Sequence, residues 1–95
     1  MTELKDEQTV KWGNKSVLLQ KRQHSFSSCA KAKLVKGVDL VVVTTDDFGG
    51  GFEAWVEYSL GETFCTGEFR KTLQGAVNSA YKDLVKIQTL GSRIL

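Results

Sequence analysis

The 95-residue chain has no proline, only one histidine (His24) and only two cysteines (Cys29 and Cys65). These numbers exclude a disulfide framework and a complete zinc site, so both cysteines are expected to be small buried hydrophobes. No apolar run approaches the roughly 18 residues that a membrane-spanning helix needs, and residues 1–7 lack the apolar stretch of a signal peptide. We expect one cytoplasmic domain over residues 1–95, with no metal, cofactor or membrane partner.

Charge is distributed unevenly along the chain, although the net charge is only +2. Residues 1–37 hold eight lysines and arginines against three acids, and residues 38–68 hold seven acids without a lysine or arginine. Residues 69–95 are basic again, with five lysines and arginines against one acid. Such blocks predict either an acidic surface patch or pairing of the blocks with one another across the fold.

Short strands are predicted over the first half of the chain. Gly13-Asn14 lies between segments 9–12 and 15–20 and predicts a hairpin with a two-residue turn, after a frayed segment 1–8. Segment 29–35 fits a short helix and also fits a strand, because its alanines alternate with lysines. Segment 39–45 is rich in β-branched residues and predicts a strand.

A second hairpin is predicted from the alternation of apolar and polar residues. Residues 52–60 alternate strictly, which indicates a half-buried strand, and segment 63–69 is the expected partner strand. A two-residue turn at Gly61-Glu62 would set Leu60 against Thr63 and therefore Val56 against Gly67.

An amphipathic helix is predicted after Thr72, with Gly91 just past its end. Its apolar residues recur at helical spacing and are Leu73, Ala76, Val77, Ala80, Tyr81 and Leu84. The predicted fold class is α+β, an antiparallel β-sheet of three to five strands with a C-terminal helix packed on one face.

Candidate catalytic groups are few. Cys65 and His24 are a conceivable nucleophile and base, but the alternation places Cys65 on the core face of its strand, where a structural role is favoured. The carboxylates Glu53, Glu57 and Glu68 have no histidine beside them in the sequence for metal or acid–base chemistry. We expect no catalytic residues and no enzymatic activity.

The outer face of the predicted second hairpin carries two large aromatic residues, Trp55 and Phe64, among acids. Aromatic residues ringed by carboxylates are typical of an interface whose acids steer a basic partner. The predicted partner-binding residues are Asp46, Asp47, Glu53, Trp55, Glu57, Phe64 and Glu68. The alternative interpretation is that the N-terminal segment, with Trp12, Leu18 and Leu19, folds over this face and buries Trp55.

Strands 52–60 and 63–69 and the alanine-containing helix from Leu73 resemble a unit found in small phage-encoded inhibitor proteins, including anti-CRISPR proteins. The resemblance covers residues 52–88 and implies an inhibitor that acts in the host cytoplasm. The stretch Gly67–Lys71 and the following helix are also similar to the last strand and helix of double-stranded-RNA-binding domains. Those domains have a lysine cluster where this chain has only Arg70 and Lys71.

Two functions are therefore expected as alternatives. The first is a non-enzymatic protein-interaction module, and by the resemblance an inhibitor, that presents its acidic hairpin to a basic host protein or protein–nucleic-acid complex; homodimer formation stays open. The second is a weak nucleic-acid-binding domain that uses the basic N-terminal segment, with Trp12 stacking on a base. Its predicted binding residues are Lys11, Trp12, Lys15, Lys21, Arg22, Lys31 and Lys33.

Overall fold

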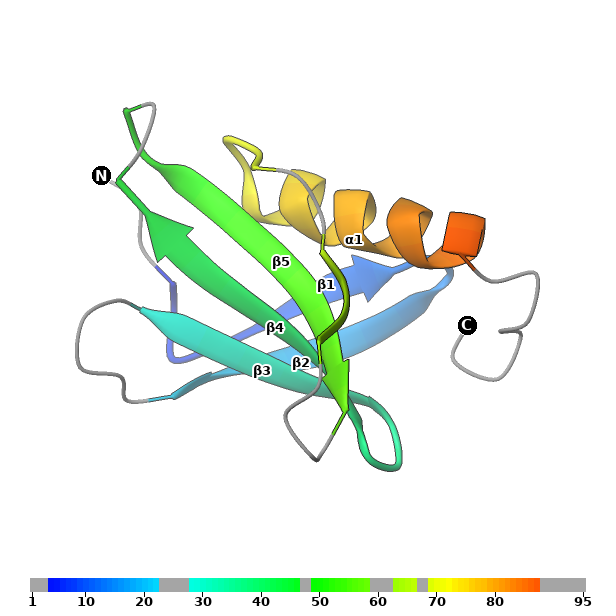
Figure 1. The fold of residues 1–95 in the computed structure, drawn as a ribbon. Helices are drawn as coiled ribbons and strands as arrows, with labels where there is room; N and C mark the ends of the chain where they lie inside the picture. The colour runs from blue at the N-terminus through cyan, green and yellow to red at the C-terminus, as the bar shows by residue number, and fades with distance from the viewer. Residues whose placement is uncertain (1–3, 23–27, 47–48, 59–62, 67–68, 88–95) are drawn as a thin grey trace.

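The computed structural model describes residues 4–22, 28–46, 49–58, 63–66 and 69–87. Within these residues, six antiparallel strands form one sheet in sequence order, and a helix follows them. The elements are β1 (Glu7–Trp12), β2 (Lys15–Arg22), β3 (Cys29–Val35), β4 (Val38–Thr45), β5 (Gly51–Tyr58), β6 (Thr63–Thr66) and α1 (Leu73–Ile87). Figure 1 shows a curled sheet with α1 lying along one face. The predicted α+β class is confirmed, with six strands where three to five were expected.

The predicted N-terminal hairpin is confirmed, since Trp12 pairs with Lys15 around a two-residue turn in which Gly13 has a φ of 62°. The expectation of a frayed N-terminal segment is wrong for residues 4–8, which pack against the domain. Leu4 is buried in the core, and the Lys5 backbone N–H donates a hydrogen bond to Gln8 Oε1. The apolar side chain of Leu4 gives this segment a reason to pack against the domain.

Segment 29–35, which the sequence left undecided, is the strand β3. Ala30 and Ala32 pair with Val42 and Leu40 and are buried on the side of the sheet that faces α1. The alternation of alanine and lysine fits this strand, because the alanines are buried in the core while Lys31 and Lys33 lie on the opposite face.

The register of β5 and β6 differs from the prediction. Val56 pairs with Cys65 rather than Gly67, and Glu57 pairs with Thr63 across an irregularity between Val56 and Glu57. The predicted turn residues 61–62 lie outside the described part of the chain. The observed pairing leaves five residues between Glu57 and Thr63, where the prediction left two between Leu60 and Thr63.

The helix begins as predicted, with the Thr72 side-chain oxygen accepting a hydrogen bond from the Gly75 backbone N–H at 3.1 Å. Its fully buried residues are Ala76, Val77, Ala80 and Leu84, and the helix packs chiefly on β5 and β1. Two small alanines on this face let the helix backbone approach the sheet closely. The core therefore lies between α1 and the concave side of the sheet.

Trp12 belongs to this core. It is 2% exposed, and its ring meets that of Tyr81 edge to face with centroids 5.1 Å apart. Leu19 is buried in the same cluster, whereas Leu18 is 48% exposed. The interpretation that these three residues cover Trp55 is therefore wrong, and Trp12 is not accessible for stacking on a base.

Candidate protein-interaction surface

The surface of the sheet that faces away from α1 is called the outer face. Its residues alternate along each strand with the buried residues of the core, such as Leu40, Val42, Ala54 and Val56. The strand register arranges the outer face of β2–β5 in three rows. Row one is Arg22, Cys29, Val43 and Glu53; row two is Gln20, Lys31, Val41 and Trp55; row three is Lys33, Asp39 and Glu57.

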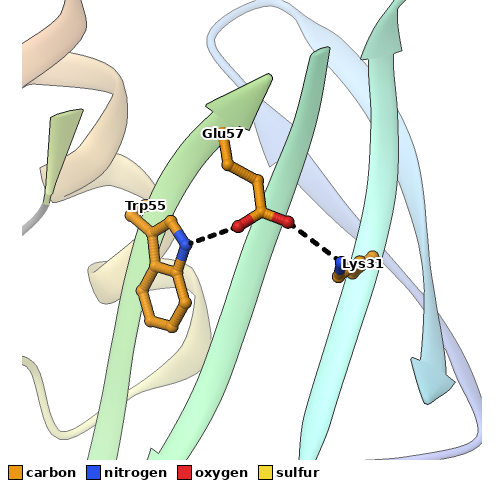
Figure 2. A network of polar contacts seen from close by, with 3 residues as sticks. All are labelled: Lys31, Trp55 and Glu57. Atoms are coloured by element: carbon orange, nitrogen blue, oxygen red, sulfur yellow. Dashed lines mark hydrogen bonds and ion pairs between the residues drawn. The ribbon is translucent and has the colours of Figure 1, made fainter. Parts of the chain in front are cut away.

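A polar network crosses the middle of the outer face, as Figure 2 shows. The Trp55 indole N–H donates a hydrogen bond to Glu57 Oε2 at 3.3 Å. The other carboxylate oxygen, Oε1, accepts a hydrogen bond from Lys31 Nζ at 2.9 Å, which is also an ion pair. One carboxylate therefore joins β3 to β5 and fixes the orientation of the indole.

The network covers Val41, the residue of β4 that lies between Lys31 on β3 and Trp55 on β5. Val41 lies on the outer face yet is only 2% exposed, and its neighbours across the strands are Lys31 and Trp55. In Figure 2 the carboxylate of Glu57 reaches across β4 toward Lys31. The outer face thus has a small apolar centre of its own, formed by the buried residues Val41 and Cys29. Trp55 and its polar partners cover this centre.

Burial and hydrogen bonding act against each other on the ionisable groups of this centre. Burial alone would raise the pKa of Glu57, but the hydrogen bonds from Lys31 and Trp55 outweigh it and hold this pKa below its ordinary value. The hydrogen bond to Glu57 raises the pKa of Lys31. Burial raises the pKa of the Cys29 thiol, which keeps it protonated and unreactive near neutral pH.

The charge on the outer face is divided rather than uniformly acidic. Basic residues lie on β2 and β3, and acidic residues lie on β4 and β5. The basic and acidic sequence blocks meet at the ion pair of Lys31 and Glu57. This contact agrees with the expectation that the blocks pair with one another across the fold. In the part of the chain that the structure describes, Arg22, Lys33, Asp39 and Glu53 form no ion pair.

The structure brings together three of the seven predicted partner-binding residues: Glu53, Trp55 and Glu57. Asp46 is exposed just after the end of β4. Asp47 and Glu68 lie outside the described residues, and of Phe64 only the backbone, in β6, lies within them.

The predicted nucleic-acid-binding residues do not form one patch. Lys15 and Arg22 stand at opposite ends of β2, which at about 3.3 Å per residue places them roughly 23 Å apart. Lys11 Nζ donates a hydrogen bond to Ser16 Oγ, and Lys31 is held by Glu57. The remaining residues, Lys21 and Lys33, are exposed.

Sequence reasoning missed Asp39 and Val41 as members of this surface. Both belong to segment 39–45, where the alternation of buried and exposed residues is hidden because Leu40, Val41 and Val42 are all apolar and all buried. The ionic partner of Glu57 was also missed, since Lys31 lies two strands away and is brought close only by the placement of β3 beside β4.

Within the described ranges, no three or more histidine, cysteine, aspartate or glutamate residues gather where they would hold a metal ion. The helix in this part of the chain is not long and apolar enough to cross a membrane.

Comparison with protein-family models, curated proteins and solved structures gives no match.

Proposed function

We propose that this protein is a non-enzymatic protein-interaction module that binds a basic protein surface through the β4–β5 half of its outer face. The observation that carries the proposal is the indole of Trp55, which is half-buried and held by Glu57 on the sheet face that α1 does not cover. A ring that is already fixed in one orientation loses little side-chain entropy on binding, which favours tryptophan as an interface anchor.

The chemistry of the partner follows from the acids around Trp55. Glu53 precedes it by two residues on the same face, and Asp39 lies on the neighbouring strand, both without an ion-pair partner in the described segments. Such carboxylates attract lysine and arginine and exclude acidic surfaces. Nucleic-acid-binding sites of proteins are basic surfaces of this kind, and at such a site of a host complex the acids would compete with phosphate.

The test compares three proteins as bait in a nuclease-treated lysate: wild type, Trp55→Ala and Val85→Ala. Val85 is a matched control because it is an apolar residue, 43% exposed, on the helix and away from the outer face. We expect wild type and Val85→Ala to capture the same basic protein and Trp55→Ala to lose it. With that partner purified, Trp55→Ala should weaken binding by about 2 kcal/mol, which is roughly 30-fold in Kd.

Thermal melting of the same three proteins separates binding from folding. Because Trp55 packs beside the buried Val41, Trp55→Ala is expected to lower stability modestly while leaving the domain folded. A loss of roughly 3–5 kcal/mol, as for a core tryptophan, would show that Trp55 is a structural residue. Equal capture by Trp55→Ala, or capture that disappears with nuclease treatment, would also contradict the proposal.

A further inference from the structure

The charges on the outer face are arranged in opposite signs about the line between β3 and β4. Row one begins with Arg22 on β2 and ends with Glu53 on β5, with the apolar pair Cys29 and Val43 between them. In row three, Lys33 on β3 and Asp39 on β4 stand on either side of the same line.

We infer that the outer face binds a second copy of this chain about a two-fold axis that runs parallel to the strands along this line. The axis exchanges β3 with β4 and β2 with β5 between the two copies, and every contact of such an interface occurs twice. It places Arg22 opposite Glu53 of the second copy and Lys33 opposite Asp39 of the second copy. All four groups lack an ion-pair partner among the described residues.

The apolar groups of the outer face fit the same axis. Cys29 comes opposite Val43 of the second copy at the centre of row one, so the charged pairs lie at its two ends. In row two, Trp55 comes opposite Gln20 of the second copy, so the indole meets a neutral side chain. Two twisted sheets pack face to face with their strands within about 30° of each other, and an axis along the strands allows this.

The size of the surface indicates a weak association. Four strands about 4.8 Å apart and three rows about 6.8 Å apart give roughly 400 Å² per copy, or roughly 800 Å² in total. Stable specific interfaces bury about 1,200 Å² or more. The dimer is therefore weak, forms at high protein concentration and is sensitive to salt, because its polar contacts lie at the rim.

The inference does not depend on the proposed function, although both use the outer face. A basic partner would compete with the second copy for Trp55 and Glu53. If the isolated protein proves monomeric, the dimer is excluded while binding of a basic partner remains as proposed.

Sedimentation velocity of the purified protein from about 10 µM to 1 mM, at low and high salt, tests the dimer. We expect concentration-dependent association that weakens with salt. Arg22→Glu and Glu53→Arg should each weaken association at least tenfold, because each variant places like charges opposite each other. Lys82→Glu, on the exposed side of α1, should have no effect and serves as the charge control.

Mixing Arg22→Glu with Glu53→Arg should restore association, since every contact between the two different variants again joins opposite charges. The double variant Arg22→Glu/Glu53→Arg should associate as wild type does. Melting curves identify any variant that fails to fold, and Lys33→Glu with Asp39→Lys provides a second pair for the same experiment. Absence of association at 1 mM, insensitivity to the single reversals, or failure of the mixture to associate would each overturn the inference.

Discussion

Glu57 joins β3 to β5 across β4 through one carboxylate. Its two oxygens accept hydrogen bonds from Lys31 on β3 and from Trp55 on β5, and the chain between those strands is β4 with the buried Val41. Removing the charge of Glu57 should therefore affect the ion pair with Lys31 more than the hydrogen bond from the indole, which a neutral oxygen also accepts.

The pH dependence of this ion pair is the prediction at the residue scale. The pKa of Glu57 is lowered in the folded protein, so its contribution to stability is present above the unfolded pKa and is lost as pH falls through the folded one. The pKa of Lys31 is raised, so its contribution is present at all pH values below the unfolded pKa of about 10.4. At acidic pH, the protonation of Glu57 alone therefore determines where the ion pair stops contributing to stability.

A double-mutant cycle with Glu57→Gln and Lys31→Gln measures the coupling by chemical denaturation at several pH values. Because Lys31 is partly exposed, we expect a coupling of at most about 1 kcal/mol at pH 7. The coupling should fall as the pH drops below the ordinary range of carboxylate pKa values, because Glu57 then becomes protonated. A coupling that persists unchanged in strong acid would show that the contact is not ionic.

The N-terminal hairpin and the helix hold each other in place. The Gln74 side chain accepts a hydrogen bond from the Lys11 backbone N–H at 2.9 Å and donates one to the Lys11 carbonyl oxygen at 2.7 Å. This amide pairs with the open edge of β1 as a neighbouring strand would, which protects part of that edge from other chains. Tyr81 lies over the turn of the hairpin, so close to Gly13 that a Cβ there would come within 2.5 Å of its ring.

Gly13→Ala tests this contact between elements. The substitution adds a methyl group against Tyr81 at a backbone φ of +62°, so strain and overpacking should together cost about 2–4 kcal/mol of unfolding free energy. Gly49→Ala is the matched control, because its φ is +82° but among the described residues its Cβ would meet only Lys71 Nζ, at 3.4 Å. Gly49→Ala should cost about 1–2 kcal/mol. Equal losses in urea denaturation would mean that Tyr81 moves aside freely.

Local signals account for the elements that were predicted. The β1–β2 hairpin has a glycine-led turn, β4 and β5 have β-branched or alternating residues, and α1 has a capping threonine with a helical apolar stripe. β3 could not be decided, since alanine and lysine favour helices while their alternation favours a strand. Only its pairing with β4 settled the structure.

The candidate site was also predicted only where local signals exist. Alternation along β5 placed Glu53, Trp55 and Glu57 on one face, because side chains of a strand point to opposite sides in turn. The β5–β6 register was wrong because an irregularity between Val56 and Glu57 has no local sequence signal. The partnership of Glu57 with Lys31 depends on the order of the strands, which no segment contains by itself.

At the scale of the whole molecule, the basic and acidic blocks of the sequence become the two halves of one sheet face. Arg22 shares row one with Glu53, Lys33 shares row three with Asp39, and Lys31 of row two forms an ion pair with Glu57 of row three. A phosphate backbone approaching the basic half would therefore meet the field of the acidic half as well. This arrangement favours contact with protein over contact with nucleic acid.

Weak binding to nucleic acid is the corresponding prediction. Trp12 is buried in the core, Lys31 is paired with Glu57, and a net charge of +2 provides few phosphate contacts. Fluorescence anisotropy with labelled 20-nucleotide DNA and RNA, single- and double-stranded, should give Kd values above about 10 µM at about 150 mM salt, without sequence preference. The variant Asp39→Lys/Glu53→Lys should bind more tightly and with a steeper salt dependence, because it removes the acidic half of the outer face and adds positive charge. Sub-micromolar binding by the wild type that Lys33→Glu abolishes would contradict this account and assign the outer face to nucleic acid.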